Sequence, residues 1–393
     1  MVEYVSSGAA TRTHRRREAA DVASFVRALD WVLIASVGAL IGYGLWGIAG
    51  ITRQDVPGSP NYYVTRQAIF VAVGVVALVA TLVIDPALYR HRWRAILGVA
   101  AAAIAFVYLE GQAVRGSHRW IDLGFFRFQP SEFGKVLFVV ALAGFLAERT
   151  KRLNEARTVV SALGLAAIPV VLVFLQPDFG TAMVYLAALG AALFVSGVRW
   201  LHVAAVGACV LFAAVFVLWL LPAGGIHLLA PYQADRLTGF LHPDSDPRGT
   251  TYNITQSKNA IGSGQLRGRG VAGATQTTLN FLPEHATDFV FASFAEERGF
   301  VGCAILLALY LLVVWRGLRV VTLARDAFSA IVAGALVCAL VFQIFVNVGM
   351  TMGIAPITGI PLPFMSVGGS SMITNLIGVG LLLGIHARAR RRR

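Results

Sequence analysis

The sequence predicts an all-α polytopic membrane protein of ten transmembrane helices, with a large extracytoplasmic loop between the seventh and eighth helices. The chain of 393 residues is 57% hydrophobic and only 13% charged, which is roughly half the charged fraction of a soluble domain. Its mean hydropathy is +0.71. Apolar runs long enough to cross the roughly 30 Å hydrocarbon core of a bilayer recur along most of the chain. These observations together favour a multi-pass membrane protein.

The apolar runs define the expected helices in order. They lie at 30–49, 66–84, 94–110, 131–147, 158–175, 179–196, 200–221, 287–314, 328–351 and 367–386. The fifth and sixth runs are separated only by Gln176-Pro177-Asp178, which predicts a tight hairpin. We expect three regions: a cytoplasmic tail over 1–29, one transmembrane domain over 30–386 that includes the extracytoplasmic loop 222–287, and a basic cytoplasmic tail over 387–393.

The distribution of basic residues predicts the orientation. The net charge is +13, but most Lys and Arg residues lie in short segments that alternate with the apolar runs. This pattern is typical of the positive-inside rule, with both termini in the cytoplasm, rather than of nucleic-acid binding. The Arg-rich N-terminus precedes a run too long for a signal-peptide core, so we expect an uncleaved first helix. The three cysteines fall inside apolar runs without paired spacing, which argues against a disulfide or a metal knuckle.

The loop 222–287 is too long to be a simple connection between packed helices. Its apolar pieces and tyrosines predict short amphipathic helices on the outer leaflet, with a solvated surface loop as the alternative. Two glycine pairs, Gly262-Ser263-Gly264 and Gly268-Arg269-Gly270, lie near Lys258 and Arg267. Such a segment could surround a phosphate with N–H groups and cations, although this signal is weak by itself.

The stretch Phe281–Gly302 places several charged residues before and within an apolar helix. Pro283 predicts a helix start, which puts Glu284 and Asp288 on one helical face, one turn apart. Two acids at a helix N-terminus are also explained by the helix dipole alone. As a functional pair, they could supply a general base or hold a divalent cation. Glu296 and Glu297 lie deeper on other faces, so we expect them to form a buried packing network.

Polar residues also mark the ends of other expected helices. Gln129-Pro130-Ser131-Glu132 and Gln176-Pro177-Asp178 each combine proline with a capping residue, so helix initiation is a sufficient explanation. Glu132 and Lys135 are spaced for an i,i+3 ion pair. Small residues at 368–371 would allow close packing or close approach of a ligand.

These motifs together resemble the SEDS family (shape, elongation, division and sporulation), which includes FtsW, RodA and SpoVE. The resemblance extends over nearly the whole chain from about residue 30. It is carried by Leu282-Pro283-Glu284, Thr287-Asp288-Phe289, Glu296-Glu297, Gly299, Arg119-Trp120-Ile121, Gln129-Pro130-Ser131-Glu132, Gln176-Pro177-Asp178-Phe179-Gly180-Thr181, Gln256-Ser257-Lys258, Ala260-Ile261-Gly262-Ser263-Gly264, and Gly359-Ile360-Pro361-Leu362-Pro363-Phe364 followed by Ser366 and Gly368-Gly369-Ser370-Ser371. Phe281-Leu282-Pro283, Asp246-Pro247 and Ala295-Glu296-Glu297 resemble the RodA branch more than the FtsW branch.

The resemblance implies a peptidoglycan glycosyltransferase of the bacterial cytoplasmic (inner) membrane that polymerises lipid II during cell-wall elongation. The family's essential aspartate corresponds to Asp288, and a class B penicillin-binding protein is the implied partner beside membrane lipids. The sequence departs from the family's pattern at Ala286, Gln265 and Val367, which weakens any fixed role for His285.

The expected reaction uses Asp288 as general base on the GlcNAc 4-hydroxyl, with undecaprenyl pyrophosphate as leaving group and nearby cations to stabilise it. No cofactor is certain, and a divalent cation (Mg or Mn) bound by Glu284 and Asp288 is left open. The expected substrate-binding residues are Glu284, Arg115, Arg119, Trp120, Gln129, Glu132, Lys135, Asp178, Gln256, Lys258 and Ser370. Arg267 and Arg269 are further candidate cations. The alternatives are a lipid II flippase, an FtsW-type division polymerase, and a scaffold without a reactive carboxylate.

Overall fold

The computed structural model describes residues 23–114, 117–122, 124, 126–225, 229, 231–241 and 251–391. The structure is a bundle of long helices. They are α2 (Trp31–Ile51), α3 (Tyr62–Val83), α5 (Trp93–Glu110), α6 (Pro130–Ala147), α7 (Ala156–Leu175), α8 (Phe179–Val195), α9 (Trp200–Val215), α15 (Val290–Leu323), α16 (Ala327–Thr351) and α17 (Gly369–Arg391). In the described part of the chain, nine helices are long and apolar enough to span a membrane, where α9 is counted together with η2 and α10 as the continuous helix Trp200–Ala223. α8 is a shorter apolar helix of 17 residues. The all-α polytopic class is therefore confirmed, and ten spans remain a prediction.

Shorter elements connect the long helices. The connection between α5 and α6 contains the small antiparallel sheet β1 (Gln112–Val114), β2 (Ser117–Asp122) and β3 (Arg127–Phe128). The other short elements are α4 (Pro86–His91), η1 (Thr150–Arg152), η2 (Phe216–Leu220), α10 (Leu221–Ala223), α11 (Pro231–Thr238), η3 (Gly239–Leu241), α12 (Tyr252–Gly264), α13 (Gly270–Gly273) and α14 (Thr275–Thr278). The four helices α11 to α14 all belong to the loop predicted at 222–287.

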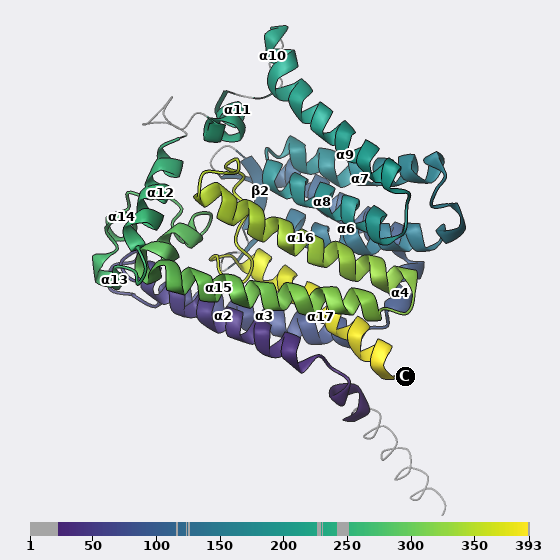
Figure 1. Cartoon of the computed structure of the whole chain (residues 1–393), viewed down its shortest axis with the longest axis horizontal. Coiled ribbons are helices and arrows are strands. Elements are labelled where there is room, and N and C mark those ends of the chain that lie inside the picture. Colours follow the sequence, from purple (N-terminus) through teal and green to yellow (C-terminus); the bar gives the residue numbers. More distant parts are fainter. Residues whose placement is uncertain are drawn as a thin grey trace, which may run out of the picture.

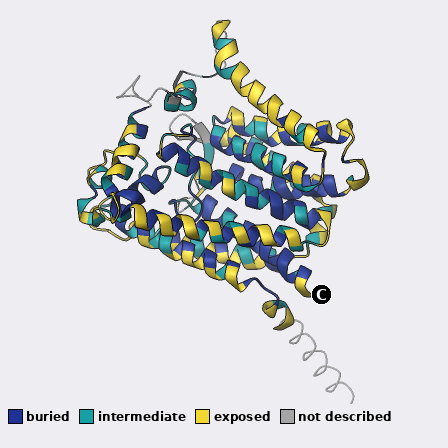
Figure 2. Ribbon diagram, in the orientation of Figure 1, coloured by how far each residue is buried: buried dark blue, intermediate teal, exposed yellow. Residues whose placement is uncertain are grey.

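The bundle has a buried centre and an apolar periphery. Most of α6 and α17 is buried, with 83% and 89% of their most apolar windows inside the protein, whereas only 6% of the α9 window is buried. Figure 2 shows α9 as an almost wholly exposed helix beside the bundle. Side chains such as Val76 and Leu211 are exposed on the outer helices. A surface of this kind suits lipid, because acyl chains solvate apolar side chains without cost.

Helices distant in sequence lie side by side in the bundle. In Figure 1, α2, α3, α15 and α17 run together, and α16 lies beside α8 and α15. The start of α2 and the end of α17 lie at one end of the bundle, and the start of α15 and helices α12 to α14 lie at the other. We call these the terminal end and the loop end of the bundle.

The second half of the long loop packs on the bundle. α12 contacts α15 and α16, and the buried hydroxyl of Ser257 on α12 donates to the carbonyl of Thr351 at 2.7 Å. The alternative of a solvated surface loop is therefore wrong for the described residues 251–289. Short helices are confirmed, and their position on the outer leaflet stays a prediction.

The glycine-rich segment after α12 has a structural role at a break in α15. Gly299 has φ 65° inside α15, so the helical hydrogen bonds are interrupted there. Phe300 N–H donates to Gln265 O at 2.8 Å, and Val301 N–H donates to Leu266 O at 3.1 Å. A Cβ on Gly268 would overlap the backbone of Glu297. The glycines thus allow the loop backbone to replace missing helical partners, which explains them without a bound phosphate.

The buried network predicted around Glu296 and Glu297 is confirmed. The Glu296 carboxylate accepts hydrogen bonds from the N–H groups of Gln276 (2.8 Å) and Thr277 (3.0 Å) and from the Thr277 hydroxyl (2.8 Å). It therefore caps the N-terminus of α14 from another helix. Glu297 lies 3.8 Å from Arg298, whose guanidinium stacks 3.6 Å from the ring centre of Trp46.

Glu296→Gln should reduce the stability of the protein by about 1–3 kcal/mol, because an amide offers one acceptor oxygen where the carboxylate receives three hydrogen bonds. The measurement is thermal unfolding of purified protein in a mild detergent. Glu155→Gln, in an exposed pair with Arg152, is the matched control and should leave the transition in place. Equal transitions for all three proteins would contradict the capping role.

Candidate active site at the loop end of the bundle

Asp288 lies in a turn before α15 and not in the helix itself. Residues 283–289 form consecutive turns, and α15 begins at Val290. Glu284 has φ 54°, in the left-handed region, and its carbonyl accepts from the N–H groups of Thr287 and Phe289, both at 3.1 Å. The predicted helix start at Pro283 and the shared helical face of Glu284 and Asp288 are therefore wrong. The left-handed residue closes a turn where helical geometry would have continued the helix.

Hydrogen-bond donors from other segments hold this turn at three successive backbone carbonyls. The carbonyl of Ala286 accepts from Val367 N–H at 3.0 Å, and that of Thr287 accepts from the Ser366 hydroxyl at 2.6 Å. The carbonyl of Asp288 accepts from the side-chain amide of Asn347 on α16 at 2.9 Å. The backbone that carries Asp288 is thus held by α16 and by the segment between α16 and α17.

The supporting segment is itself held by other helices. The Asn347 amide also donates to Ile360 O at 2.7 Å. Gln67 on α3 donates to Ser366 O at 3.1 Å and accepts from Gly368 N–H at 3.2 Å. Gln67 and Asn347 are both buried. Asn347 therefore uses its amide inside an apolar span to connect two backbone segments, and Gln67 ties the segment 366–368 to α3. These bonds give the turn little freedom to move.

Two other polar groups define the electrostatic surroundings of the turn. His285 Nε2 lies 3.0 Å from Asp55 Oδ1, in the connection between α2 and α3. A Cβ atom placed on Gly359 would lie 3.4 Å from Nη2 of Arg236, on α11, and 3.4 Å from Oδ2 of Asp288. The cation and the carboxylate therefore both face Gly359, whose φ is 71°. Asp288 itself is partly exposed, so a reactant can reach it.

Several predicted binding residues meet in a second cluster, around the turn between α7 and α8. Arg119 Nε donates to Gln176 O at 2.9 Å, and its Nη2 donates to Pro177 O. Its Nη1 lies 3.9 Å from Asp178 Oδ1. Asp178 also caps α8 by accepting from Thr181 N–H at 3.2 Å. The guanidinium of Arg119 therefore fixes strand β2 on the hairpin and has an internal partner for each of its nitrogens.

Gln129 and Ser370 extend this cluster to the last helix. The Gln129 side chain donates to Asp178 Oδ2 at 3.2 Å, and its backbone N–H donates to Ser370 Oγ at 3.0 Å. The Ser370 hydroxyl donates to Arg127 O at 3.1 Å. Three of these predicted binding residues, Gln129, Asp178 and Ser370, thus connect the starts of α6, α8 and α17 through mutual hydrogen bonds.

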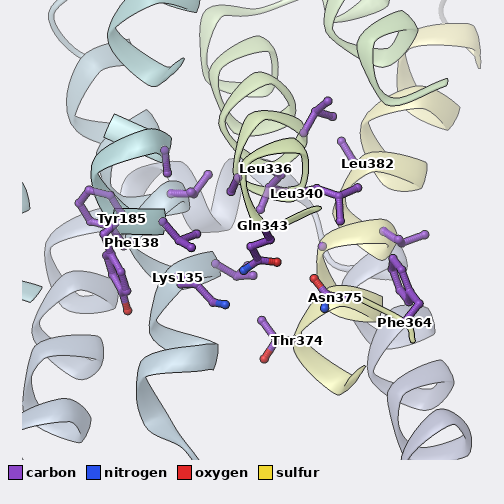
Figure 3. A pocket seen from close by; sticks show the side chains of 18 residues that line it. Lys135, Phe138, Tyr185, Leu336, Leu340, Gln343, Phe364, Thr374, Asn375 and Leu382 are labelled. Atoms are coloured by element: carbon purple, nitrogen blue, oxygen red, sulfur yellow. The ribbon is translucent and has the colours of Figure 1, made fainter. Parts of the chain in front are cut away.

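The predicted pair of Glu132 and Lys135 is confirmed, with 2.8 Å between Nζ and Oε1 and both side chains buried. Lys135 faces a mainly apolar pocket between α6, α8, α16 and α17 (Figure 3). The polar groups that Figure 3 shows in this pocket are Lys135, Tyr185, Gln343, Thr374 and Asn375. The rest of its lining is aliphatic or aromatic, which suits an acyl or isoprenoid chain.

The remaining predicted residues do not join either cluster through a described contact. Gln256 and Lys258 lie on α12, where Lys258 is exposed and its stem packs near Gly353. Trp120 is partly buried on β2. Arg269 donates to Ser263 O at 3.0 Å, within its own loop. Arg115 lies outside the described residues, so its predicted role is not addressed by the structure.

The residues around Asp288 do not form an obvious metal site. In the described ranges, no group of three or more His, Cys, Asp or Glu side chains is arranged to hold a metal ion. Glu284 no longer shares a helical face with Asp288, and its Oε2 accepts from the Thr287 hydroxyl at 2.8 Å. The binding of a divalent cation by Glu284 and Asp288 stays a prediction, and no reaction step is assigned to one.

Four residues at the site were not identified from the sequence: Asn347, Gln67, Arg236 and Asp55. A usable signal existed for two of them. Asn347 and Gln67 are buried amides inside apolar helices, and polar groups at membrane depth normally have a task. Their partners are remote in sequence, so only the folded structure identifies what they hold.

Asn347→Leu should lower the activity of the site by about tenfold or more, because a displacement of about 1 Å at a reacting group is costly. Leucine has a similar size but cannot donate to the carbonyls of Asp288 and Ile360. The measurement is glycosyl transfer by purified protein. Asn154→Leu is a control for a lost amide away from the turn, because the side-chain oxygen of Asn154 accepts from Arg199 N–H at 2.9 Å on the exposed surface. A loss for Asn347→Leu no larger than that for Asn154→Leu would contradict the positioning role.

The fold and the site together define an integral membrane protein that presents a fixed, partly exposed carboxylate beyond the end of an apolar helix, next to a cationic side chain. A family model described as "Cell cycle protein", FtsW/RodA/SpoVE, matches residues 28–391. The chain belongs to this family.

Relatives and solved structures agree with this family over most of the chain. The peptidoglycan glycosyltransferase MrdB of Escherichia coli is 37% identical over 91% of this chain and 93% of its own length. The stage V sporulation protein E of Bacillus subtilis is 34% identical over 91% of this chain and 95% of its own. A chain of a peptidoglycan synthase complex matches with a TM-score of 0.77 and 27% identity, covering 92% of this chain and 98% of that one. RodA of Thermus thermophilus matches with a TM-score of 0.66 and 26% identity, over 91% of this chain and 96% of RodA.

Proposed function

We propose that this protein is a peptidoglycan glycosyltransferase that polymerises lipid II, with Asp288 as the general base. One observation carries the proposal: the backbone of Asp288 is held at 2.9 Å by a buried amide, in a turn fixed at three successive carbonyls, and yet the residue stays partly exposed. A general base needs a carboxylate that stays ionised and is held close to the nucleophile. The similarity to MrdB and to RodA supports this activity.

In the proposed reaction, the Asp288 carboxylate accepts the proton from the GlcNAc 4-hydroxyl of the acceptor. The freed oxygen attacks the MurNAc anomeric carbon of the donor, with inversion, as the bond from that carbon to the pyrophosphate oxygen breaks. Undecaprenyl pyrophosphate leaves with the electron pair. Arg236, which faces the same position at Gly359 as Asp288, is the described cation best placed to stabilise the developing charge.

Other features support the assignment of the substrate as a polyprenyl-linked sugar. The apolar pocket between α6, α8, α16 and α17 offers an environment for an isoprenoid chain. Lys135 at its wall keeps its charge paired with Glu132 at 2.8 Å, so a neutral chain does not have to face an unpaired ammonium group.

The main rival function is a flippase for the same lipid. A transporter needs ionisable groups near the midplane that change partners during transport. Two of the described intramembrane acids instead have fixed local partners, since Glu132 pairs with Lys135 and Glu296 caps α14. A third, Glu297, is buried 3.8 Å from Arg298 without a hydrogen bond. A pure scaffold, the third possibility, requires no accessible carboxylate. These observations favour the enzyme, and the division-type polymerase is not favoured by the comparisons.

The test is purified protein supplied with labelled lipid II, alone and with a class B penicillin-binding protein. Glycan polymer on a gel supports the polymerase. Lipid II that crosses a liposome membrane without polymer formation supports the flippase. Neither product under any partner condition would support the scaffold. Parallel reactions with EDTA and with added Mg²⁺ or Mn²⁺ measure any dependence on a divalent cation.

The cellular setting follows from the same proposal. The protein is a multi-pass membrane protein, and both termini face the cytoplasm of a bacterium, so that the loop end of the bundle with Asp288 faces the outside, where glycan strands are made. A class B penicillin-binding protein is the proposed partner, supported by the similarity to a chain of a peptidoglycan synthase complex. Cell-wall elongation is the proposed process.

A further inference from the structure

A hollow lies at the terminal end of the bundle, far from Asp288. It is formed by the residues just before α2, the end of α15 and the end of α17, which come together in Figure 1. About 1260 Å³ of space lies between its walls, its open mouth included. Its lining residues are Ser24, Arg27, Ala28, Arg316, Arg319, Leu323, His386, Arg390 and Arg391.

The hollow is strongly basic. Of its five arginines, Arg316 is buried and donates from Nε and Nη2 to Asp30 Oδ2, at 2.9 and 2.6 Å. Arg27, Arg319 and Arg390 are exposed, and none of them has a carboxylate within ion-pair distance among the residues described. Several guanidinium groups around one space repel each other, so a bound anion would stabilise the arrangement.

A buried histidine at the floor of the hollow has unused hydrogen-bonding groups. His386 is only 2% exposed, and neither of its ring nitrogens makes a hydrogen bond. Its Nδ1 lies 3.7 Å from Asp30 Oδ2, beyond hydrogen-bond distance. At least one ring nitrogen carries a hydrogen in either tautomer. A buried donor without an acceptor is costly, and an anion in the hollow would supply that acceptor.

The surroundings indicate a lipid as the source of the anion. Trp315 and Leu318 flank Arg316 and Arg319 in sequence, and their side chains are 54% and 52% exposed. Exposed tryptophan and leucine beside arginine are typical of the level where headgroups meet acyl chains. An anion held here would therefore have apolar protein surface next to it, which a lipid can cover and inorganic phosphate cannot.

We propose that this hollow binds the phosphate of an anionic phospholipid headgroup, with Arg27, Arg319 and Arg390 at its rim and Arg316 and His386 at its floor. Guanidinium groups bind phosphate oxygens through paired N–H donors. The binding site is separate from the polymerisation site, and the proposal does not depend on the proposed function.

The test is binding of a fluorescent phosphatidylglycerol to the full chain in detergent, compared with a fluorescent phosphatidylcholine. The triple variant Arg27→Gln, Arg319→Gln and Arg390→Gln should bind phosphatidylglycerol about tenfold or more weakly, because each arginine near an anionic lipid contributes substantially to binding. The affinity for phosphatidylcholine should not change. All three side chains are exposed, and size-exclusion chromatography checks that the variant folds.

The charge-matched control is Lys151→Gln, Arg152→Gln and Arg157→Gln, which removes three exposed cations from the connection between α6 and α7 and from the first turn of α7. It should retain the affinity of the parent protein. An equal loss in both triple variants would show non-specific attraction to surface charge and overturn the proposal. Full displacement of the lipid by sodium phosphate, but not by sodium chloride of equal ionic strength, would overturn the lipid assignment in favour of a free-phosphate site.

Discussion

Asp288→Asn is expected to abolish polymerisation of lipid II while the protein remains folded. Asparagine has the shape of aspartate but cannot take up the proton of the acceptor hydroxyl, and loss of a general base costs about 10²–10⁴ in rate. The contacts that fix the turn are made by the backbone carbonyls of residues 286–288, so the substitution leaves them in place. The measurement is glycan polymer formed from labelled lipid II by purified protein, with and without the penicillin-binding partner.

Asp85→Asn is the matched control for this experiment. Asp85 is exposed and caps α4 by accepting from Ala87 N–H at 2.9 Å, at a distance from the proposed site. It should polymerise lipid II at the parent rate. If Asp288→Asn makes as much polymer as the parent protein, Asp288 is not the base, although the polymerase function itself would stand.

The second large effect is a loss of protein stability on substitution of a buried ion pair at the terminal end of the bundle. Asp30 and Arg316 are 2% and 7% exposed, and two hydrogen bonds join them. Removal of one member of such a pair leaves an unpaired buried charge, which costs about 3–5 kcal/mol. Arg316→Leu should therefore lower the thermal unfolding temperature of the purified protein by many degrees.

A double substitution measures the contribution of the ion pair to stability separately from the contributions of its two side chains. Asp30→Leu with Arg316→Leu removes both charges, so it should destabilise the protein less than the sum of the two single substitutions. Arg152→Leu breaks an exposed pair with Glu155, at 3.9 Å, and should have little effect because exposed pairs contribute little. An unchanged unfolding temperature for Arg316→Leu would contradict the stabilising role of the pair.

The helices of this protein were largely predictable because each one carries its own signal. An apolar run of membrane-spanning length identifies α2 or α16 within a few residues, whatever lies next to it. The i,i+3 spacing likewise predicts the ion pair of Glu132 and Lys135, since both partners belong to one turn of α6. Glu296 was recognisable as structural for a similar reason, because a buried carboxylate at that depth requires donors.

The geometry of the proposed site was predictable only in part. The sequence around Pro283 favours a helix, but buried Leu282 and the left-handed Glu284 turn the chain before α15 begins. The bonds that favour this turn come from Asn347, Ser366 and Val367, which lie 59 or more residues further along. The local sequence pattern around Pro283 does not indicate partners that are so distant in the chain. The same holds for Arg236, which lies near Gly359, as Asp288 does, although 52 residues separate Arg236 from Asp288 in the sequence.

The hydrogen bonds that hold the Asp288 turn also constrain the biosynthesis of the protein. Asn347, Ser366 and Val367 all follow Asp288 in the chain, and Gly368, which Gln67 holds, directly precedes α17. A membrane protein is inserted from its N-terminus as it is made, so α15 enters the bilayer before any of these partners exists. A nascent chain that ends before α16 therefore has the carboxylate but lacks the bonds that hold its turn in place. The turn is fixed only once α16 and the segment up to Gly368 have been made, so we expect no glycan synthesis by shorter chains.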